Sequence, residues 1–272
     1  MKTQDATPSL LRLLWRDEHL VVIYKPAGWL VHRTGLDAGE TRIVLQVLRD
    51  QLGQPVYPVH RLDKGTCGVL LMALHSEAAR RLALAFERHE VDKRYLALVR
   101  GWAPALAEVE HPLRPDDSPA SAPAQPARTT LRCLARLEWP ESFDPRHQST
   151  RLSLVQAQPH TGRRHQIRRH LKHLAHPIIG DATHGKGPLN RWWAQRMGVT
   201  RLWLHAHALD LVHPFTRAPL ALRSGLKIQP DRRSDEACCP VAGGDKDLAD
   251  WRQLLHISSL WQWEHDASNH LP

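Results

Sequence analysis

The sequence predicts an α+β protein with a mainly antiparallel sheet flanked by helices and loops. Short apolar runs of strand length alternate irregularly with segments whose apolar residues recur at helical spacing. A regular alternation of strands and helices would instead favour a doubly wound parallel sheet. The chain has 272 residues, which is enough to bury a core and lies between one large domain and two small ones.

The N-terminal part of the chain contains elements of both kinds. Residues 20–24 form an apolar run that predicts a buried strand, and residues 69–74 form a second run that is too short for most helices. Residues 41–53 carry apolar side chains at helical spacing and end in a glycine, as helices commonly do. We expect Ser76 to cap the helix that follows it.

The rest of the chain predicts further strands, a basic helix and a loop. Strands are expected in four segments, residues 93–101, 128–139, 151–159 and 201–214. Residues 162–181 are typical of a basic helix followed by an apolar turn. Residues 112–127 are too rich in Pro, Ala and Ser to pack, so they predict a mobile surface loop. We expect one body over residues 1–230 and a C-terminal extension of unassigned role over residues 231–272, which includes a Trp-bearing helix candidate.

The charge balance indicates the class of partner. The chain has 37 Lys and Arg residues against 28 Asp and Glu residues, a formal charge of +9 that favours a polyanion, most commonly nucleic acid. The N-terminus has neither the apolar core nor the cleavage site of a signal peptide, and no run of about 18 apolar residues occurs. The four cysteines are sparse and two are adjacent, which disfavours a disulfide framework. We expect a cytoplasmic protein with no membrane association.

Asp63 is the candidate functional carboxylate because it lies between a basic pair and an apolar run. If the basic helix begins near Gly162, four residues share one face: Arg164, Ile167, Arg168 and Leu171. Two arginines then lie beside an apolar stripe, and a buried arginine needs a carboxylate or phosphate partner. Asp63 is the obvious carboxylate, although spacing alone leaves a purely structural Asp–Arg pair equally open.

Several other chemistries lack support in the sequence. No second carboxylate lies close to Asp63, which weakens the two-acid arrangement of a glycosidase. Four histidines cluster in the basic helix region, namely His165, His170, His173 and His176. No acid or cysteine nearby completes a metal-ligand set with them, so we expect them to be solvated or to face RNA. Neither a dinucleotide nor a nucleoside triphosphate motif occurs, and we expect no metal and no cofactor.

Four ordered motifs carry a resemblance to a known family, and the resemblance covers the chain from about residue 13 to about residue 224. The segment HRLDKGTCGVLLMA is similar to the catalytic motif of the RluA-type pseudouridine synthases, usually His-Arg-Leu-Asp, two residues and Thr-Ser-Gly. The segments KRYLALVRG, TGRRHQIRRHLKHLAHPIIGD and RLWLHAHALDLVHPF resemble the other family motifs in the same order. Cys67 stands at the usual serine, and we interpret it as structural. The resemblance implies the pseudouridine synthase catalytic fold over residues 1–230, without an S4 RNA-binding domain.

The resemblance also implies a role for each matching residue. Asp63 would be the nucleophile that attacks the target nucleotide at the ribose C1′ or at the uracil ring. Arg168 would pair with it, Tyr95 would stack on the flipped base and could act as a base, and Leu204 would line the pocket. Arg61 would open the RNA and fill the vacated space, because a stacked uridine exposes neither its glycosidic bond nor C5.

The basic residues near these motifs are expected to meet the RNA. His60, Arg163 and Arg164 join the expected substrate-binding residues, although Arg164 stands where the family often has Thr or Ser. Further candidates for phosphate contacts are Lys25, Arg33, Arg94, Arg169 and Lys172. Each of these could equally be a solvated surface charge.

The expected partner is tRNA. Within the family, the segment DEHLVVIYKPAGWLVHRTGLD is most similar to enzymes that modify uridine 65 in the T-stem region of certain tRNAs. Two alternatives remain open, the same chemistry on ribosomal RNA and a non-catalytic RNA-binding protein, and the intact set of Asp63, Tyr95 and Arg168 argues against the second. We expect a monomer with no protein partner.

Overall fold

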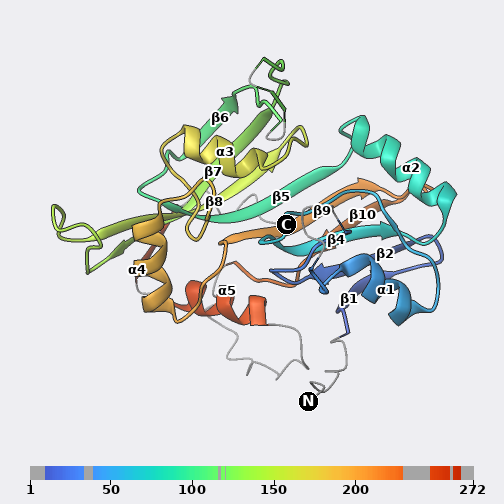
Figure 1. Cartoon of the computed structure of the whole chain (residues 1–272), viewed down its shortest axis with the longest axis horizontal. Coiled ribbons are helices and arrows are strands. Elements are labelled where there is room, and N and C mark those ends of the chain that lie inside the picture. The colour runs from blue at the N-terminus through green and yellow to red at the C-terminus, as the bar shows by residue number, and fades with distance from the viewer. Residues whose placement is uncertain are drawn as a thin grey trace.

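A computed structural model describes residues 10–33, 39–115, 118–119, 121–228, 246–257 and 260–264. Within these ranges the chain forms a large sheet with five helices around it, as Figure 1 shows. The expected α+β class with a mainly antiparallel sheet is therefore confirmed. Cys238 and Cys239 lie outside the described residues.

The described strands join into one eleven-stranded sheet. They are β1 (Leu13–Arg16), β2 (Leu20–Lys25), β3 (Tyr57–Pro58), β4 (Cys67–Ala73), β5 (Asp92–Arg100), β6 (Leu106–Glu110), β7 (Arg128–Trp139), β8 (Thr150–Pro159), β9 (Leu204–Val212), β10 (Pro219–Arg223) and β11 (Trp261–Trp263). The main order is β1-β2-β4-β9-β5-β8-β7-β11, with β10 beside β9, β3 beside β4 and β6 beside β7. Only the β4–β9 pairing among them is parallel.

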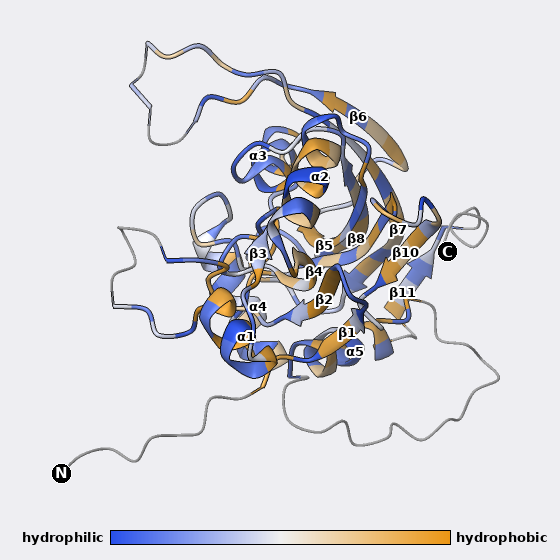
Figure 2. Ribbon diagram, turned by 90° about the vertical axis from the view of Figure 1, so that its right-hand side faces the viewer, coloured by the Kyte–Doolittle hydropathy of each residue, from blue (hydrophilic) through white to orange (hydrophobic). Residues whose placement is uncertain are grey.

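The helices cover the sheet in different places. They are α1 (Val44–Leu52), α2 (Ser76–Glu87), α3 (Gln166–His173), α4 (Gly187–Met197) and α5 (Lys246–His256). In Figure 1, α1 and α2 lie at one end of the sheet, α4 lies at the other, and α3 lies above β7 and β8. Both orange and blue residues colour α1 and α2 in Figure 2, as expected for helices with one face on the protein.

Strands β2 and β4 are buried on both faces, which explains why they are continuous apolar runs rather than alternating ones. Val21 and Ile23 pack with α1 on one face. Leu20 and Val22, which alternate with them along the strand, pack with α2 on the other face. The two helices therefore hold the β2–β4 pair between them, and β4 leads directly out of the loop that carries Asp63.

A glycine permits the parallel contact between β4 and β9. Gly68 has a φ of 116°, and a Cβ at this position would lie 2.1 Å from the carbonyl oxygen of Ala206 in β9. No side chain fits there, so glycine allows the two strands to approach. This approach pairs Cys67 with His205 and brings the beginning of β4 beside the beginning of β9, where Leu204 lies.

The largest core cluster joins the central strands to the C-terminal helix. It includes residues of β5, β7, β8 and β9 together with α3, α4, α5 and β11. Trp251 of α5 is fully buried and packs edge-to-face on Trp203, with ring centroids 5.2 Å apart. The described part of residues 231–272 thus shares the core of the body.

Two local expectations are wrong. Helix α2 is capped by His75, whose ring accepts a hydrogen bond from the Ala78 N–H, and Ser76 is already inside the helix. Helix α3 begins at Gln166, not near Gly162, because the Gln166 side chain accepts the N–H of Arg163 and holds the preceding residues in a turn. Elsewhere, the expected strands and the helix over residues 41–53 are confirmed to within a few residues.

Candidate active site

Asp63 lies in the loop between β3 and β4, and backbone contacts fix this loop from both sides. The N–H of Thr66 donates to the Asp63 carbonyl at 3.0 Å, and the N–H of Gly28 donates to the Lys64 carbonyl at 2.7 Å. The buried ammonium of Lys25 donates to the Lys64 and Thr66 carbonyls at 3.2 and 2.7 Å. The Asp63 side chain, 26% exposed, is therefore presented from a firmly held turn.

Arg168 meets Asp63, as the sequence predicted. It projects from α3, is 8% exposed, and its Nη1 lies 3.0 Å from Asp63 Oδ2. The prediction that a buried arginine finds a carboxylate is thus confirmed. Arg164 lies before the first turn of α3, so it does not share a helical face with Arg168.

Asp181 is the residue that the sequence reasoning missed. Its buried carboxylate accepts hydrogen bonds from Nε and Nη2 of Arg168, at 2.7 and 2.8 Å. It also accepts the backbone N–H groups of Thr183 and His184, at 2.9 and 2.8 Å. Burial alone would raise the pKa of Asp181, but these hydrogen bonds and the Arg168 charge lower it below its ordinary value. The available signal was the acid at the end of the apolar turn in HPIIGD.

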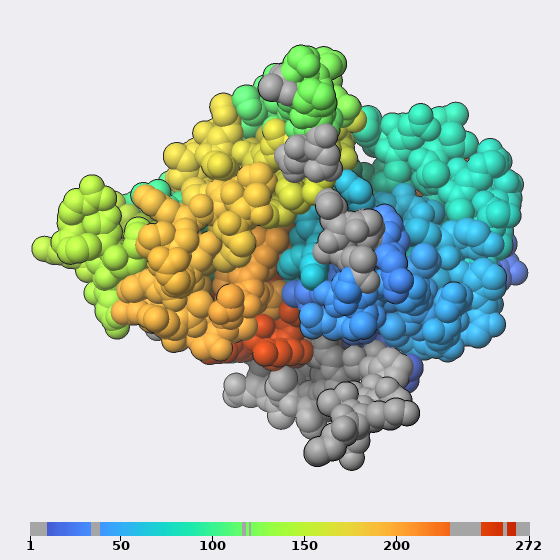
Figure 3. Space-filling view, in the orientation of Figure 1, coloured from blue at the N-terminus to red at the C-terminus, as the bar shows by residue number. Residues whose placement is uncertain are grey.

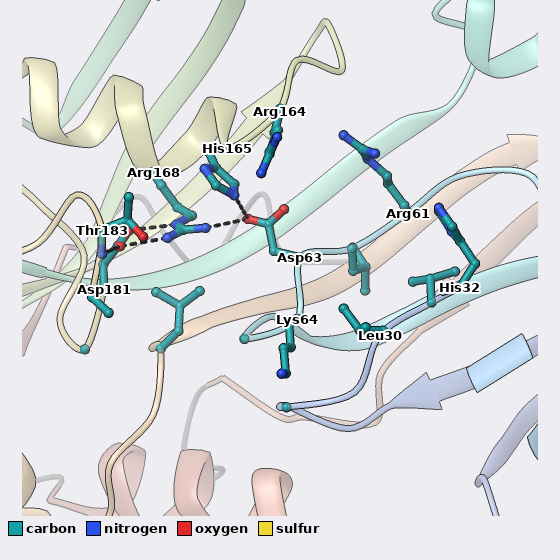
Figure 4. Close-up of a pocket in the computed structure, with 17 residues that line it drawn as sticks. Leu30, His32, Arg61, Asp63, Lys64, Arg164, His165, Arg168, Asp181 and Thr183 are labelled. Atoms are coloured by element: carbon teal, nitrogen blue, oxygen red, sulfur yellow. Dashed lines mark hydrogen bonds and ion pairs between the residues drawn. The ribbon is translucent and has the colours of Figure 1, made fainter. Parts of the chain in front are cut away.

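A histidine also approaches Asp63 from the same side. His165, the residue before α3, places Nε2 3.9 Å from Asp63 Oδ2. Its Nδ1 lies 3.2 Å from Nε2 of His184, which stands on the turn held by Asp181. Figure 4 shows Arg168 between Asp63 and Asp181, with His165 in contact with the Asp63 carboxylate and Arg164 on the same side of it. The sequence predicted only that His165 is solvated or faces RNA, and it did not single out His184.

Tyr95 and Leu204 lie together in a cavity of about 560 Å³ that opens on one side of Asp63. They come from neighbouring strands, since Tyr95 of β5 pairs with Ala206 of β9. Burial raises the pKa of the Tyr95 phenol above its ordinary value, and the charge of Asp63 raises it further. The phenol therefore stays protonated near neutral pH. The cavity therefore has an aromatic ring and an aliphatic side chain in its wall beside Asp63.

Arg61 and His60 lie in the wall of the same cavity but in different environments. Arg61 is exposed at the mouth. His60 stacks on Phe86, with ring centroids 4.7 Å apart, and its Nε2 accepts the N–H of Leu71. Burial lowers the pKa of His60 to about 3, so the ring is neutral and its contacts to the protein are structural.

A second cavity, of about 690 Å³, lies on the other side of Asp63. The residues that line both cavities are Arg61, Leu62, Asp63, Arg164, His165 and Arg168. Asp63 is therefore at the division between two hollows. Figure 3 shows the face on which the N-terminal part of the chain (blue, on the right) meets later segments (yellow to orange, on the left).

The other residues predicted to contact phosphates differ in how exposed they are. Arg163 and Lys172 are exposed, and Arg169 is half-buried. Lys25 is fully buried, so the prediction that it reaches RNA is wrong. Arg94 is also wrongly assigned, because it lies one residue from Tyr95 on the opposite sheet face and pairs with Asp210.

Two further findings concern the described residues alone. No three His, Cys, Asp or Glu side chains there are grouped so that they could hold a metal ion. No helix in those ranges has the length and apolarity needed to cross a membrane. Cys67 is buried, with Sγ 2.9 Å from Nη2 of Arg201, and burial raises the pKa of its thiol.

The fold and the aspartate–arginine pair at the divided cleft define the class of protein. Residues 19–173 match the RNA pseudouridylate synthase family, and the chain belongs to that family. The RluA-type resemblance of the motifs is thereby confirmed, and the protein is a pseudouridine synthase.

Two relatives and one solved structure are similar to this chain over most of its length. It is 48% identical over 229 residues to the tRNA pseudouridine synthase C of Salmonella typhimurium, covering 80% of this chain and 86% of the relative. It is 46% identical over 224 residues to the tRNA pseudouridine synthase C of Vibrio cholerae, covering 80% and 91%. The structure of human RNA Pseudouridylate Synthase Domain Containing 4 is similar, with a TM-score of 0.59, 28% identity, and coverage of 78% of this chain and 87% of that one.

Proposed function

We propose that this pseudouridine synthase acts on tRNA, converting uridine 65 in the T-stem region to pseudouridine with Asp63 as the nucleophile. The observation that carries the proposal is the Asp63 carboxylate, held 3.0 Å from the Arg168 guanidinium where two cavities meet. The names of the relatives support tRNA as the substrate. We further propose that the enzyme works as a cytoplasmic monomer, which sedimentation and cell fractionation test.

The chemistry requires an ionised carboxylate beside a base that has left the RNA stack. The Asp63 carboxylate attacks either the ribose C1′ or the uracil ring, and the N1–C1′ bond breaks. The base turns and C5 bonds to C1′. If Asp63 is attached at C1′, this new bond displaces its carboxylate, and if Asp63 is attached to the ring, the carboxylate leaves the ring afterwards. Finally C5 loses its proton, and N1 gains one. Arg168 pairs with Asp63 and orients its carboxylate for the first step.

The cavity that contains Tyr95 and Leu204 is the proposed place of the flipped uracil. Its volume of about 560 Å³ is within the range of small-molecule sites. Tyr95 supplies an aromatic face for stacking, and Leu204 supplies an apolar wall. Arg61, exposed at the mouth, is placed to enter the gap that the base leaves in the RNA.

Release of tritium from uridine C5 tests the function, because only attachment through C5 displaces that atom. We would incubate tRNA and, separately, ribosomal RNA labelled at C5 with the unchanged protein, with Asp63→Asn and with Asp50→Asn, an exposed control in α1. The proposal expects release from tRNA, loss of release with Asp63→Asn, and no change with Asp50→Asn. Mapping pseudouridine along the tRNA then tests position 65.

The outcomes separate the alternatives. Release from ribosomal RNA alone would overturn the tRNA assignment while keeping the reaction. Undiminished release with Asp63→Asn would overturn the nucleophile. No release from either RNA, with tight RNA binding, would indicate a non-catalytic RNA-binding protein.

A further inference from the structure

The pair formed by His165 and His184 is unused in the steps above, although it lies against the nucleophile. Nε2 of His165 is 3.9 Å from Asp63 Oδ2, and Nδ1 is 3.2 Å from Nε2 of His184. The two rings are steeply inclined, with an interplanar angle of 71°. The His165 side chain is 16% exposed and borders both cavities.

The backbone of His165 is strained, and the buried carboxylate of Asp181 holds the backbone of His184. His165 has a φ of 54°, a left-handed conformation that is strained for a non-glycine residue. Such strain persists only where surrounding contacts determine the conformation, and it is concentrated at functional sites. On the other side, Asp181 accepts the N–H of His184 at 2.8 Å while it also binds Arg168. One carboxylate therefore holds both the Arg168 guanidinium and the backbone from which the His184 ring projects.

One tautomer of this pair places an unprotonated nitrogen of His165 at the reaction centre. When Nδ1–H of His165 donates to Nε2 of His184, the Nε2 of His165 carries the lone pair. That lone pair is on the Asp63 side of the ring. The charged or titratable groups around it are Asp63 from the β3–β4 loop, Arg164 and Arg168 from its own segment, and Asp181 and His184 from the turn after α3.

The last step of the reaction needs such a base. C5 must lose its proton after it has bonded to C1′, whichever atom Asp63 attacks first. Tyr95 is a poor acceptor for this proton. Burial and the charge of Asp63 raise the pKa of its phenol, so the phenol stays neutral, and a neutral phenol is a weak base. The arginines are permanently protonated.

We propose that His165 is a further catalytic residue, the base that removes the C5 proton, and that His184 is its positioning residue. The inference rests on the proposed function. The C5–H bond breaks and its proton passes to Nε2 of His165. The electron pair forms the C5=C6 double bond and displaces the C6=N1 pair onto N1, which takes a proton from water. Asp63, released by then, faces the resulting imidazolium as a counter-charge.

A substrate without a C5 proton gives the sharpest test. His165→Asn is chosen because asparagine tolerates a positive φ better than most residues and cannot take the proton. Single-turnover rates are measured on RNA containing uridine, 5-deuterouridine or 5-fluorouridine. We expect a fall of roughly 10²–10⁴-fold on uridine, a larger deuterium isotope effect than in the unchanged enzyme, and an unchanged rate of glycosidic-bond rearrangement on 5-fluorouridine.

The positioning role of His184 is tested by rescue. His184→Gln retains a carbonyl that can accept from His165 Nδ1–H and keeps most of the uridine rate, whereas His184→Leu loses it. The acid limb of the pH–rate profile on uridine, present in the unchanged enzyme, disappears in His165→Asn. His147→Gln, an exposed change in the β7–β8 loop, leaves all rates unchanged.

Two results would overturn the inference. In one, His165→Asn keeps the uridine rate and the isotope effect of the unchanged enzyme. In the other, its rates on uridine and 5-fluorouridine fall equally, which indicates a structural role. Failure of the unchanged enzyme to release C5 tritium from any RNA would instead overturn the proposed function.

Discussion

Arg168 donates two hydrogen bonds to Asp181 and one to Asp63. The orientation of the guanidinium is therefore set by the fully buried carboxylate of Asp181, and the partly exposed carboxylate of Asp63 takes the remaining N–H. Because the guanidinium is planar and Asp181 fixes one edge of it, the N–H that Asp63 accepts also has a fixed direction. Asp181 thus determines where Asp63 is stabilised without touching it.

Replacing Asp181 should therefore impair both stability and catalysis. Asp181→Asn leaves Arg168 buried and without its main counter-charge, and we expect a loss of about 3–5 kcal/mol in the free energy of unfolding. The single-turnover rate should also fall, because Arg168 is no longer oriented toward Asp63. Urea unfolding and tritium release measure the two effects. Glu77→Gln, which breaks only an exposed ion pair with Arg80 and Arg81, is the matched control and should have a much smaller effect on both.

The same residue gives a pH dependence of definite sign. The pKa of Asp181 is lower in the folded protein than its ordinary value near about 4. The unfolded chain therefore binds the proton first as pH falls, so the contribution to stability is complete above about pH 4 and is lost as pH drops through the folded value. Unfolding curves at descending pH should show a steeper loss for the unchanged protein than for Asp181→Asn. Parallel pH dependence of the two proteins would contradict the assignment.

Lys25 should be needed for catalysis more than for stability. Its ammonium donates to the carbonyls of Pro26, Lys64 and Thr66, which hold the Asp63 loop. In Lys25→Met the loss of these hydrogen bonds is offset by removal of a buried charge, so the stability change is small. A loosened Asp63 loop, however, should lower the single-turnover rate on the order of 10²-fold. A variant as active as the unchanged enzyme would show that other contacts suffice.

Alkaline unfolding gives a separate measurement on Lys25. Burial lowers the pKa of its ammonium to about 8, against about 10.4 in an unfolded chain. Between these values the unfolded chain holds more protons, so this group makes the free energy of unfolding rise with pH. The unchanged protein should gain stability relative to Lys25→Met from pH 8 upward. If the free energy of unfolding of the unchanged protein instead falls relative to that of Lys25→Met over this pH range, the lowered pKa of Lys25 is contradicted.

The sequence predicted the Asp63–Arg168 pair but not the two residues that hold it in place, Asp181 and Lys25. The Asp63–Arg168 pair follows from a general rule, since a buried arginine requires an acid. Asp181 was missed because an acid after an apolar turn resembles an ordinary turn residue, and only the fold brings it against α3. Lys25 at the end of a strand resembles a surface lysine, and its burial depends on carbonyls some forty residues later. Such contacts depend on topology, which local patterns do not specify.

The exposed cations near α3 should give RNA affinity its salt dependence. Lys172 is exposed on α3, and we expect Lys172→Ala to weaken binding for all RNA sequences alike. If it contacts a phosphate, the slope of log affinity against log salt should decrease by about 0.7–0.9. Arg146→Ala, in the exposed β7–β8 loop, is the control and should leave the slope unchanged. Fluorescence anisotropy over a salt series measures both, and an affinity independent of salt would contradict phosphate contacts altogether.

Helix α5 should contribute to stability rather than to chemistry. Trp251 is fully buried against Trp203, and Arg201 joins Asp247 and Asp250 of α5 to the core. Both cavities beside Asp63 are lined by residues no later in the chain than Leu204.

Trp251→Ala should therefore lower the free energy of unfolding by about 3–5 kcal/mol through the cavity that it creates. The single-turnover rate of the protein that remains folded should stay unchanged, because no α5 side chain borders the site. Trp102→Ala, which removes a partly exposed ring over Arg151, is the size-matched control and should cost about 0.5–1 kcal/mol. Thermal unfolding and tritium release below the transition separate the two effects. A rate loss in fully folded Trp251→Ala would show that α5 also positions the turn at Ala27, whose N–H it binds through Asp247.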